Sequence, residues 1–395
     1  MKKGNQRLLT LAMAGVTALS MASTLTACGG DKEKTIILPN VAQAKNIILL
    51  IGDGMGPVHI EAGEILRGEK LAMQKFPYMT KVETCSVYGD ITDSAAAATA
   101  LATGVRTENG VVGKDINNND LQTIVDIAAS LGKRTGIIAT EELSGATPMG
   151  FASHADARGQ AVTLLEGAAE SSNVNLFASH VIADKYIKLF TKQGYEKVEF
   201  AEEISDSKAE KVIGSYLIPA DYASMKAEGP YVAFDRLVTE ALDFLSKDED
   251  GFFLMAEGSH IDHGSHNNEI TYMLEELLAF DDGVQAALNW AKNRNDTVVI
   301  VTADHETGGF VLEQIPDHAL MVDIFENGKN DMGWGDVYDW LSTGHTATDV
   351  NLYINGADID FAQYSFGTKD RVKNTDIFQM MKYLFTGDAP VVEVA

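Results

Sequence analysis

The chain has 395 residues, a formal net charge of −26 at pH 7 and only two cysteines, Cys28 and Cys85. So acidic a chain lacks the basic surface that nucleic-acid binding requires, and we expect no nucleic-acid partner. An anionic substrate would then have to be attracted locally, for which bound metal cations are suited.

The N-terminal segment is typical of an exported protein. Three basic residues within the first seven precede an apolar stretch over about 8–25, which is the pattern of a secretory signal peptide. The sequence Leu25-Thr26-Ala27-Cys28 resembles a bacterial lipobox, whose cysteine is lipidated. We therefore expect a lipoprotein signal peptide at 1–27, a lipid on Cys28 and a flexible tether at 28–44. A plain signal peptide and an uncleaved anchor are the alternatives.

Processing before Cys28 changes the charge and predicts the location. The mature chain would have 368 residues and a net charge of −29, because three basic and no acidic residues are removed. Cys85 would be its only other cysteine, so no intramolecular disulfide is expected. The lipid anchor places the exported protein at a membrane, periplasmic or on the cell surface. Gly29 after the cysteine is no retention signal that we recognise, which favours the outer membrane.

Buried strands alternate with helices along the rest of the chain. Apolar and β-branched runs predict strands at 46–51, 81–88, 135–139, 252–256 and 297–301. Apolar periodicity predicts helices at 121–131, 160–171, 273–292 and 377–385. This alternation predicts an α/β fold with a large, mainly parallel central sheet and helices on both faces. We expect one large domain over 45–395, with insertions at about 174–236 and 310–342. The first of these either packs as ordinary structure or covers a site.

Ionisable residues follow three of the predicted strands. Asp53 follows the strand at 46–51, Glu257 follows that at 252–256, and Asp304 with His305 follows that at 297–301. The carboxyl ends of strands form the ligand crevice of an open α/β sheet. These side chains are therefore expected to meet at one edge of the sheet.

Ser94 lies at the start of a predicted helix. Thr92 or Asp93 is suited to cap that helix, and the alanine run after Ser94 is strongly helix-forming. In the first turn of a helix, free backbone N–H groups and the helix dipole favour an anion. Ser94 is thus a candidate for phosphorylation beside a metal. The alternative is a cap on a tightly packed core helix.

The histidines are concentrated in candidate metal sites. Five of the nine fall in the segments 257–266, 304–305 and 343–349. Asp262 and His266 are four residues apart, so they would share one face of a helix. Histidine with carboxylate suits zinc, whereas carboxylate with hydroxyl suits magnesium. A pair of nearby cations can hold the attacking and leaving oxygens of an in-line displacement, which indicates phosphoryl transfer.

These motifs, in this order, resemble the alkaline phosphatase family from about residue 46 to residue 385. The resemblance implies two Zn²⁺ and one Mg²⁺, and hydrolysis of small phosphate monoesters through a phosphoserine, releasing phosphate and an alcohol. It makes Ser94 the phosphorylated serine and Arg158 the guanidinium that binds the phosphate. It implies one zinc on Asp53, Ser94, Asp304 and His305, a second on Asp262, His266 and His345, and magnesium on Asp53, Thr147 and Glu257.

Two features depart from the family pattern. The family usually has an acid or a histidine two residues before the magnesium-binding threonine, where this chain has Gly145. We therefore expect a looser magnesium site, with His263 as a residue that either compensates or lies on the surface. The loop around 175–179 also lacks the glycine-rich run that is common in relatives.

Two other functions remain open. A phosphodiesterase or another ester hydrolase, such as a sulfatase, could use the same scaffold, although sulfatases need a proline and an arginine that do not follow Ser94. A non-catalytic phosphate-binding lipoprotein would keep Arg158 and the metals without needing Ser94. A homodimer is also left open.

Overall fold

The computed structural model describes residues 44–171, 173–216, 232–327, 337–356 and 371–388. The expected signal peptide, Cys28 and all of the expected tether except Ala44 lie outside these ranges. No helix within them has both the length and the apolar character needed to cross a membrane.

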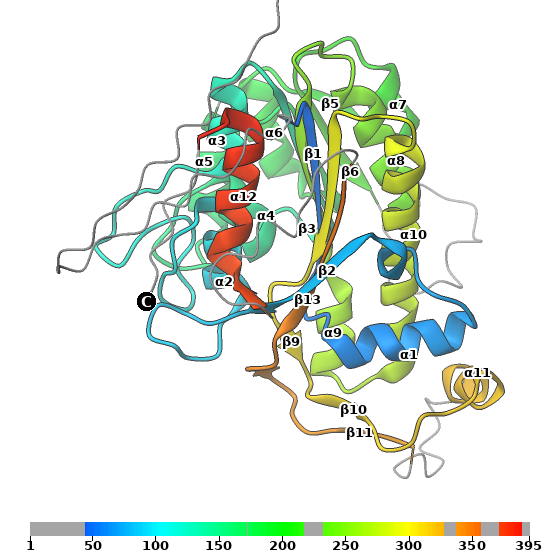
Figure 1. Cartoon of the computed structure of the whole chain (residues 1–395). Coiled ribbons are helices and arrows are strands. Elements are labelled where there is room, and N and C mark those ends of the chain that lie inside the picture. The colour runs from blue at the N-terminus through cyan, green and yellow to red at the C-terminus, as the bar shows by residue number, and fades with distance from the viewer. Residues whose placement is uncertain (1–43, 172, 217–231, 328–336, 357–370, 389–395) are drawn as a thin grey trace, which may run out of the picture.

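A large sheet forms the centre of the molecule (Figure 1). Within the described residues it has ten strands, in the order β14 (Arg371–Lys373), β2 (Tyr78–Glu83), β13 (Val350–Gly356), β8 (Thr297–Thr302), β1 (Asn46–Gly52), β7 (Phe252–Gly258), β3 (Arg134–Glu142), β4 (Leu176–His180), β6 (Val212–Tyr216) and β5 (Glu196–Val198). Within this sheet only β13 runs antiparallel to its neighbours, β2 and β8, and the other described pairs of the sheet are parallel. The predicted, mainly parallel sheet is confirmed.

Helices cover both faces of this sheet, as predicted (Figure 1). One face carries α2 (Ser94–Thr103), α3 (Ile124–Ser130), α4 (Ala146–Ala152), α5 (Ala161–Glu170) and α12 (Asn374–Thr386). The other carries α1 (Pro57–Arg67), α8 (Phe234–Leu245) and α10 (Ile270–Ala291). Because helices cover both faces, the central strands must be apolar on both sides. Accordingly, all seven residues of β1 are buried.

The remaining elements are short. The 3₁₀ helix η1 (Met73–Lys75) precedes β2, α6 (Asp184–Lys192) follows β4, α7 (Glu202–Asp206) follows β5, and α9 (His260–His266) follows β7. A pair of two-stranded sheets lies beyond β8, formed by β9 (Glu306–Thr307) with β12 (His345–Thr346) and by β10 (Phe310–Leu312) with β11 (Tyr338–Trp340). Helix α11 (His318–Asn327) lies between β10 and β11 in the sequence.

Most predicted elements are present with shifted ends, and one is partly wrong. The strand expected at 81–88 ends at Glu83, and the chain beyond it is irregular until α2. Tyr88 and Ile91 of that irregular segment are exposed, so its apolar residues are not those of a buried strand. The stretch at 174–236 packs as ordinary structure where it is described, because β4, β6 and β5 extend the edge of the central sheet. Whether it is an insertion relative to the family stays a prediction.

Candidate active site

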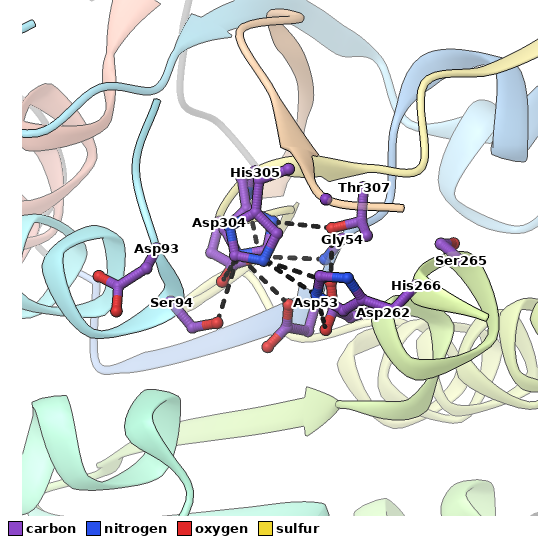
Figure 2. A network of polar contacts seen from close by, with 12 residues as sticks. Asp53, Gly54, Asp93, Ser94, Asp262, Ser265, His266, Asp304, His305 and Thr307 are labelled. Carbon is purple, nitrogen blue, oxygen red and sulfur yellow. Dashed lines mark hydrogen bonds and ion pairs between the residues drawn. The ribbon is translucent and has the colours of Figure 1, made fainter. Parts of the chain in front are cut away.

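The carboxyl ends of three central strands bring the predicted acidic residues together. Asp53 follows β1, Glu257 lies at the end of β7, and Asp304 follows β8. The register explains their proximity, since Ile51 of β1 pairs with both Glu257 and Thr302. Figure 2 shows Asp53 and Asp304 pointing toward the same space, which His305 and Asp262 also enter. The prediction of one site at this edge of the sheet agrees with this geometry.

Ser94 enters the same space from the N-terminus of α2. Asp93 caps this helix, because its carboxylate accepts a hydrogen bond from the backbone N–H of Ala96 at 3.0 Å. The Oγ of Ser94 lies 3.2 Å from Nε2 of His305 (Figure 2). The serine is buried, and the first turn of α2 presents free N–H groups beside it. A nucleophile here would attack next to an anion-binding helix end.

Asp53, Asp304 and His305, which we call the inner cluster, converge beside Ser94. Nε2 of His305 lies 3.2 Å from Oδ2 of Asp304 and 3.6 Å from Oδ1 of Asp53. All three side chains are buried. One atom from each lies within 4.8 Å of one from each of the others, the spacing of a shared metal ion.

Asp262, His266 and His345, which we call the outer cluster, lie next to the inner one. Nε2 of His266 is 3.3 Å from Oδ2 of Asp262 and 3.2 Å from Nε2 of His345. Asp262 and His345 also form a second candidate metal group with His305, whose ring stacks on that of His345 at a centroid distance of 3.6 Å. His305 therefore borders both clusters, whereas the sequence analysis had assigned it to one.

Each of the three histidines is oriented through its other ring nitrogen. Nδ1 of His266 lies 2.5 Å from the carbonyl of Thr343, and Nδ1 of His345 lies 2.8 Å from that of Thr92. A carbonyl only accepts, so both Nδ1 atoms carry a hydrogen, and both Nε2 atoms face the cluster, where they would be the atoms that bind a cation. Nδ1 of His305 contacts the hydroxyl of Thr307 at 3.2 Å. This is the usual arrangement of histidines that bind metals.

Buried oxygens of Glu257 and Thr147 identify a third candidate metal site beside Asp53, which we call the third position. Among the described residues, no hydrogen bond of regular geometry reaches either carboxylate oxygen of Glu257 or the hydroxyl of Thr147, although both side chains are fully buried and Thr147 lies close enough to lower the pKa of Glu257. Buried polar atoms are normally satisfied, so such atoms call for a ligand. Two carboxylates and a hydroxyl form an oxygen-rich set that fits a hard cation such as Mg²⁺.

The electrostatics of the site also favour cations. Burial raises the pKa values of Asp53 and Glu257 well above their usual range, and the negative charges of neighbouring carboxylates raise them further. Burial likewise raises the pKa of Asp304 to about 6 and lowers that of His305 to about 4. A bound cation would reverse the carboxylate shifts, because it stabilises the ionised form, and would lower the pKa of His305 further, because it takes the neutral imidazole as a ligand.

Asp262 behaves differently because it has cationic partners. Burial acts to raise its pKa, but the hydrogen bond from His266, the charge of His305 and the hydroxyl of Thr307 together hold it below its usual value. The same bond, which His266 donates to Asp262, is the main reason that the pKa of His266 is raised to about 9. Cation binding at the outer cluster would therefore displace a proton from His266.

Arg158 lies beside the serine and is held by Asp93, a residue that the sequence analysis treated only as a helix cap. Nη1 of Arg158 is 3.3 Å from Oδ2 of Asp93, and the Arg158 side chain is 44% exposed. The carboxylate of Asp93 also accepts from the N–H of Gly110, whose carbonyl accepts from the N–H of Arg158. These contacts fix an otherwise solvent-facing guanidinium next to Ser94.

Besides the role of Asp93 in holding Arg158, the sequence analysis missed Glu141. Glu141 is the next-to-last residue of β3, and its charge raises the pKa of Glu257. The rule that found Asp53 and Asp304, that acids at strand ends face the crevice, applies to it equally. The predicted strand at 135–139 stopped two residues too early to draw attention to it.

Comparison with known proteins agrees with this geometry. The family model described as alkaline phosphatase matches residues 44–211 and 183–334. The chain belongs to the alkaline phosphatase family. It is 32% identical over 334 residues to alkaline phosphatase 3 of Bacillus subtilis (strain 168), covering 78% of this chain and 71% of that protein.

Solved alkaline phosphatase structures show the same fold. The enzyme from the Antarctic bacterium TAB5 superposes with a TM-score of 0.73 at 27% identity, over 87% of this chain and 98% of that chain. A TAB5 variant with a histidine replaced by aspartate, described with Mg bound in the M3 site, gives a TM-score of 0.72 at 27% identity, over 87% and 99% of the two chains. The predicted alkaline phosphatase fold and enzyme class are confirmed, and phosphate monoester hydrolysis is the activity of this family.

Proposed function

We propose that this chain hydrolyses phosphate monoesters through a phosphoserine at Ser94, with two Zn²⁺ and one Mg²⁺ as cofactors. The contact that carries the proposal is that of the Ser94 Oγ with Nε2 of His305 at 3.2 Å, where three histidines turn Nε2 toward a group of buried carboxylates. The inner and outer clusters combine imidazole and carboxylate, which suits zinc, and Asp53, Thr147 and Glu257 offer oxygens alone, which suits magnesium.

The residues of the chain divide the chemistry between them. Ser94 Oγ forms a bond to phosphorus while the bond from phosphorus to the ester oxygen breaks, and an alcohol leaves. Water then attacks the phosphoserine, releases inorganic phosphate and restores the serine. Arg158, held by Asp93, and the N–H groups at the start of α2 bind the equatorial phosphate oxygens in both steps. Cations in the two clusters would supply Lewis-acid stabilisation of the attacking and leaving oxygens.

The phosphoserine is tested by a rapid-mixing experiment with a chromogenic monoester. The native protein should release a burst of alcohol matched to the enzyme concentration, with phosphate trapped on Ser94 in acid-quenched samples. Ser94→Ala should lose the burst and at least about 10³-fold in turnover, while its zinc content stays native. Near-native turnover of Ser94→Ala would overturn the proposal.

Substrate class is tested on the same preparation. Rates on a monoester, a diester and a sulfate ester should favour the monoester. Preference for the diester would support the phosphodiesterase alternative. Binding of phosphate without turnover of any ester would support the non-catalytic lipoprotein.

We also propose that the enzyme is exported as a lipoprotein anchored through Cys28, with the outer membrane as its location. The support is the order of the N-terminal residues, a basic start, an apolar run and Leu25-Thr26-Ala27-Cys28. Cys28→Ser should move the protein from the membrane fraction to the soluble fraction or block its processing. A soluble native protein with its N-terminus elsewhere would contradict the proposal.

A further inference from the structure

The end of β3 departs from regular strand geometry just before the third position. The register of β3 against β4 shifts between Ala139 and Glu142, so Thr140 and Glu141 form an irregular segment. Such irregularities next to a site redirect a side chain. Thr140 is fixed by a hydrogen bond that its hydroxyl accepts from the N–H of Ser259 at 2.8 Å, just after β7. Glu141 is thereby turned toward the end of β7, where Glu257 lies.

Gly145 leaves the space that the Glu141 side chain occupies. A Cβ atom on Gly145 would lie 1.9 Å from Oε1 of Glu141 and 2.7 Å from its Cδ. The backbone does not require glycine there, because φ −54° and ψ 152° are open to any residue. A side chain at position 145 and the Glu141 carboxylate in this position therefore exclude each other.

The interactions of Glu141 place it beside the third position. Its charge acts on both Glu257 and Asp53, and Oε2 lies 3.7 Å from Nε2 of His263. In the part of the chain that the structure describes, no hydrogen bond of regular geometry reaches the buried oxygens of Glu257 or the buried hydroxyl of Thr147. The Glu141 side chain is 22% exposed. This leaves a route to water, which a magnesium ion keeps among its ligands.

We propose that Glu141 provides the acidic group that binds Mg²⁺ or its water ligands at the third site, in place of the residue that the family pattern has at position 145. His263 acts as a positioning residue that holds this carboxylate. The inference rests on the proposed function, since it assumes a magnesium site at Asp53, Thr147 and Glu257. It also replaces the expectation from Gly145 alone: the third site has its acid, delivered from the end of β3 instead of the start of α4.

The test measures Mg²⁺ binding directly, by calorimetric titration of the zinc-loaded full-length protein. Glu141→Gln should weaken Mg²⁺ binding about 10- to 100-fold, as expected for an outer ligand of a metal site, while zinc content by mass spectrometry is unchanged. Glu142→Gln is the matched control, because Glu142 is exposed and its carboxylate accepts a long hydrogen bond from Ser144 at 3.5 Å. It should bind Mg²⁺ like the native protein.

A rescue experiment with a second substitution distinguishes a metal-binding role of Glu141 from a structural one. Gly145→Asp alone would collide with Glu141, so it should disturb Mg²⁺ binding or leave it unimproved. In the Glu141→Ala background the same substitution has room, and it should restore Mg²⁺ affinity to within about tenfold of native. If Glu141→Gln binds Mg²⁺ as tightly as Glu142→Gln does, or if the double variant recovers nothing, the inference is wrong.

These outcomes do not depend on turnover. Loss of the Ser94 burst with normal Mg²⁺ behaviour would overturn the proposed function and leave the role of Glu141 standing. A normal burst, together with Mg²⁺ binding that does not change in Glu141→Gln, would leave the proposed function standing and overturn the role of Glu141.

Discussion

The inner and outer clusters use the same two residue types but differ in how the fold supplies them. The inner residues Asp53, Asp304 and His305 follow the central strands β1 and β8, and His305 is fully buried. The outer residues come from the short helix α9 and the two-residue strand β12, and the His266 side chain is 38% exposed. Strand ends therefore supply the buried half of the site, next to Ser94. The short helix and the two-residue strand supply the half that lies nearer to solvent.

The largest effect is expected from His305→Asn, because His305 borders both clusters. Turnover should fall at least about 10³-fold, the scale of losing an essential member of a catalytic set. Zinc content should drop below that of His266→Asn, which removes a residue of the outer cluster alone. The measurements are steady-state rates and bound zinc by mass spectrometry. His318→Asn on the exposed helix α11 is the matched control. A melting curve distinguishes loss of metal from loss of the fold. Loss of one zinc with the other unaffected would show that His305 serves a single cluster.

A smaller and recoverable effect is expected from His266→Asn. The exposed position lets water replace the lost nitrogen, so turnover should fall about 10- to 100-fold by analogy with weakened metal sites. Because cation binding follows mass action, excess Zn²⁺ should restore much of the loss. The check is a zinc titration of activity for this variant beside His305→Asn. If both variants respond equally to added zinc, the difference in burial between the clusters has no functional consequence.

The difference between residues at strand ends and residues on short helices and loops also explains which site residues the sequence could reveal. Asp53, Glu257 and Asp304 were found because each directly follows an apolar run that can only be a buried strand. His345 is brought to His305 by the pairing of β12 with β9, across about forty residues of sequence with no local signal, so only the family resemblance indicated its partner. The sequence around Arg158 gave no local signal either, because its position depends on a contact with Asp93, which is 65 residues away in the sequence.

The misses arise where the backbone departs from a regular pattern. A longer predicted strand would have drawn attention to Glu141, but the direction of its side chain depends on the register shift at the end of β3 and on the space left by Gly145, and neither can be read from residue types. The strand expected at 81–88 ends early because the chain leaves the sheet after Glu83, and an apolar residue such as Tyr88 is exposed in the irregular segment that follows.

The smallest effect on activity, and a pH-dependent effect on stability, is expected at His59, a buried histidine beside the outer cluster. Its Nδ1 accepts a hydrogen bond from the N–H of Gly56 at 3.2 Å, so Nε2 carries the hydrogen and donates to the hydroxyl of Ser265 at 3.0 Å. Ser265 in turn donates to the carbonyl of Ile261 within α9. His59 therefore fixes, in its neutral form, the helix that carries Asp262 and His266.

The direction of the pH effect follows from the pKa of His59, which burial lowers from 6.5 to about 4. Between these values the unfolded chain holds a proton on His59 that the folded chain excludes, so folding stability rises with pH there. Neutral His59 contributes its full stabilisation above pH 6.5, and about 1 kcal/mol of it should be lost at pH 5.5. His59→Gln should remove this loss, so the difference in unfolding free energy between native and variant should shrink as pH falls from 7.5 to 5.5. Urea denaturation at both pH values measures it, and a difference that is constant with pH would show that His59 does not titrate as its burial requires.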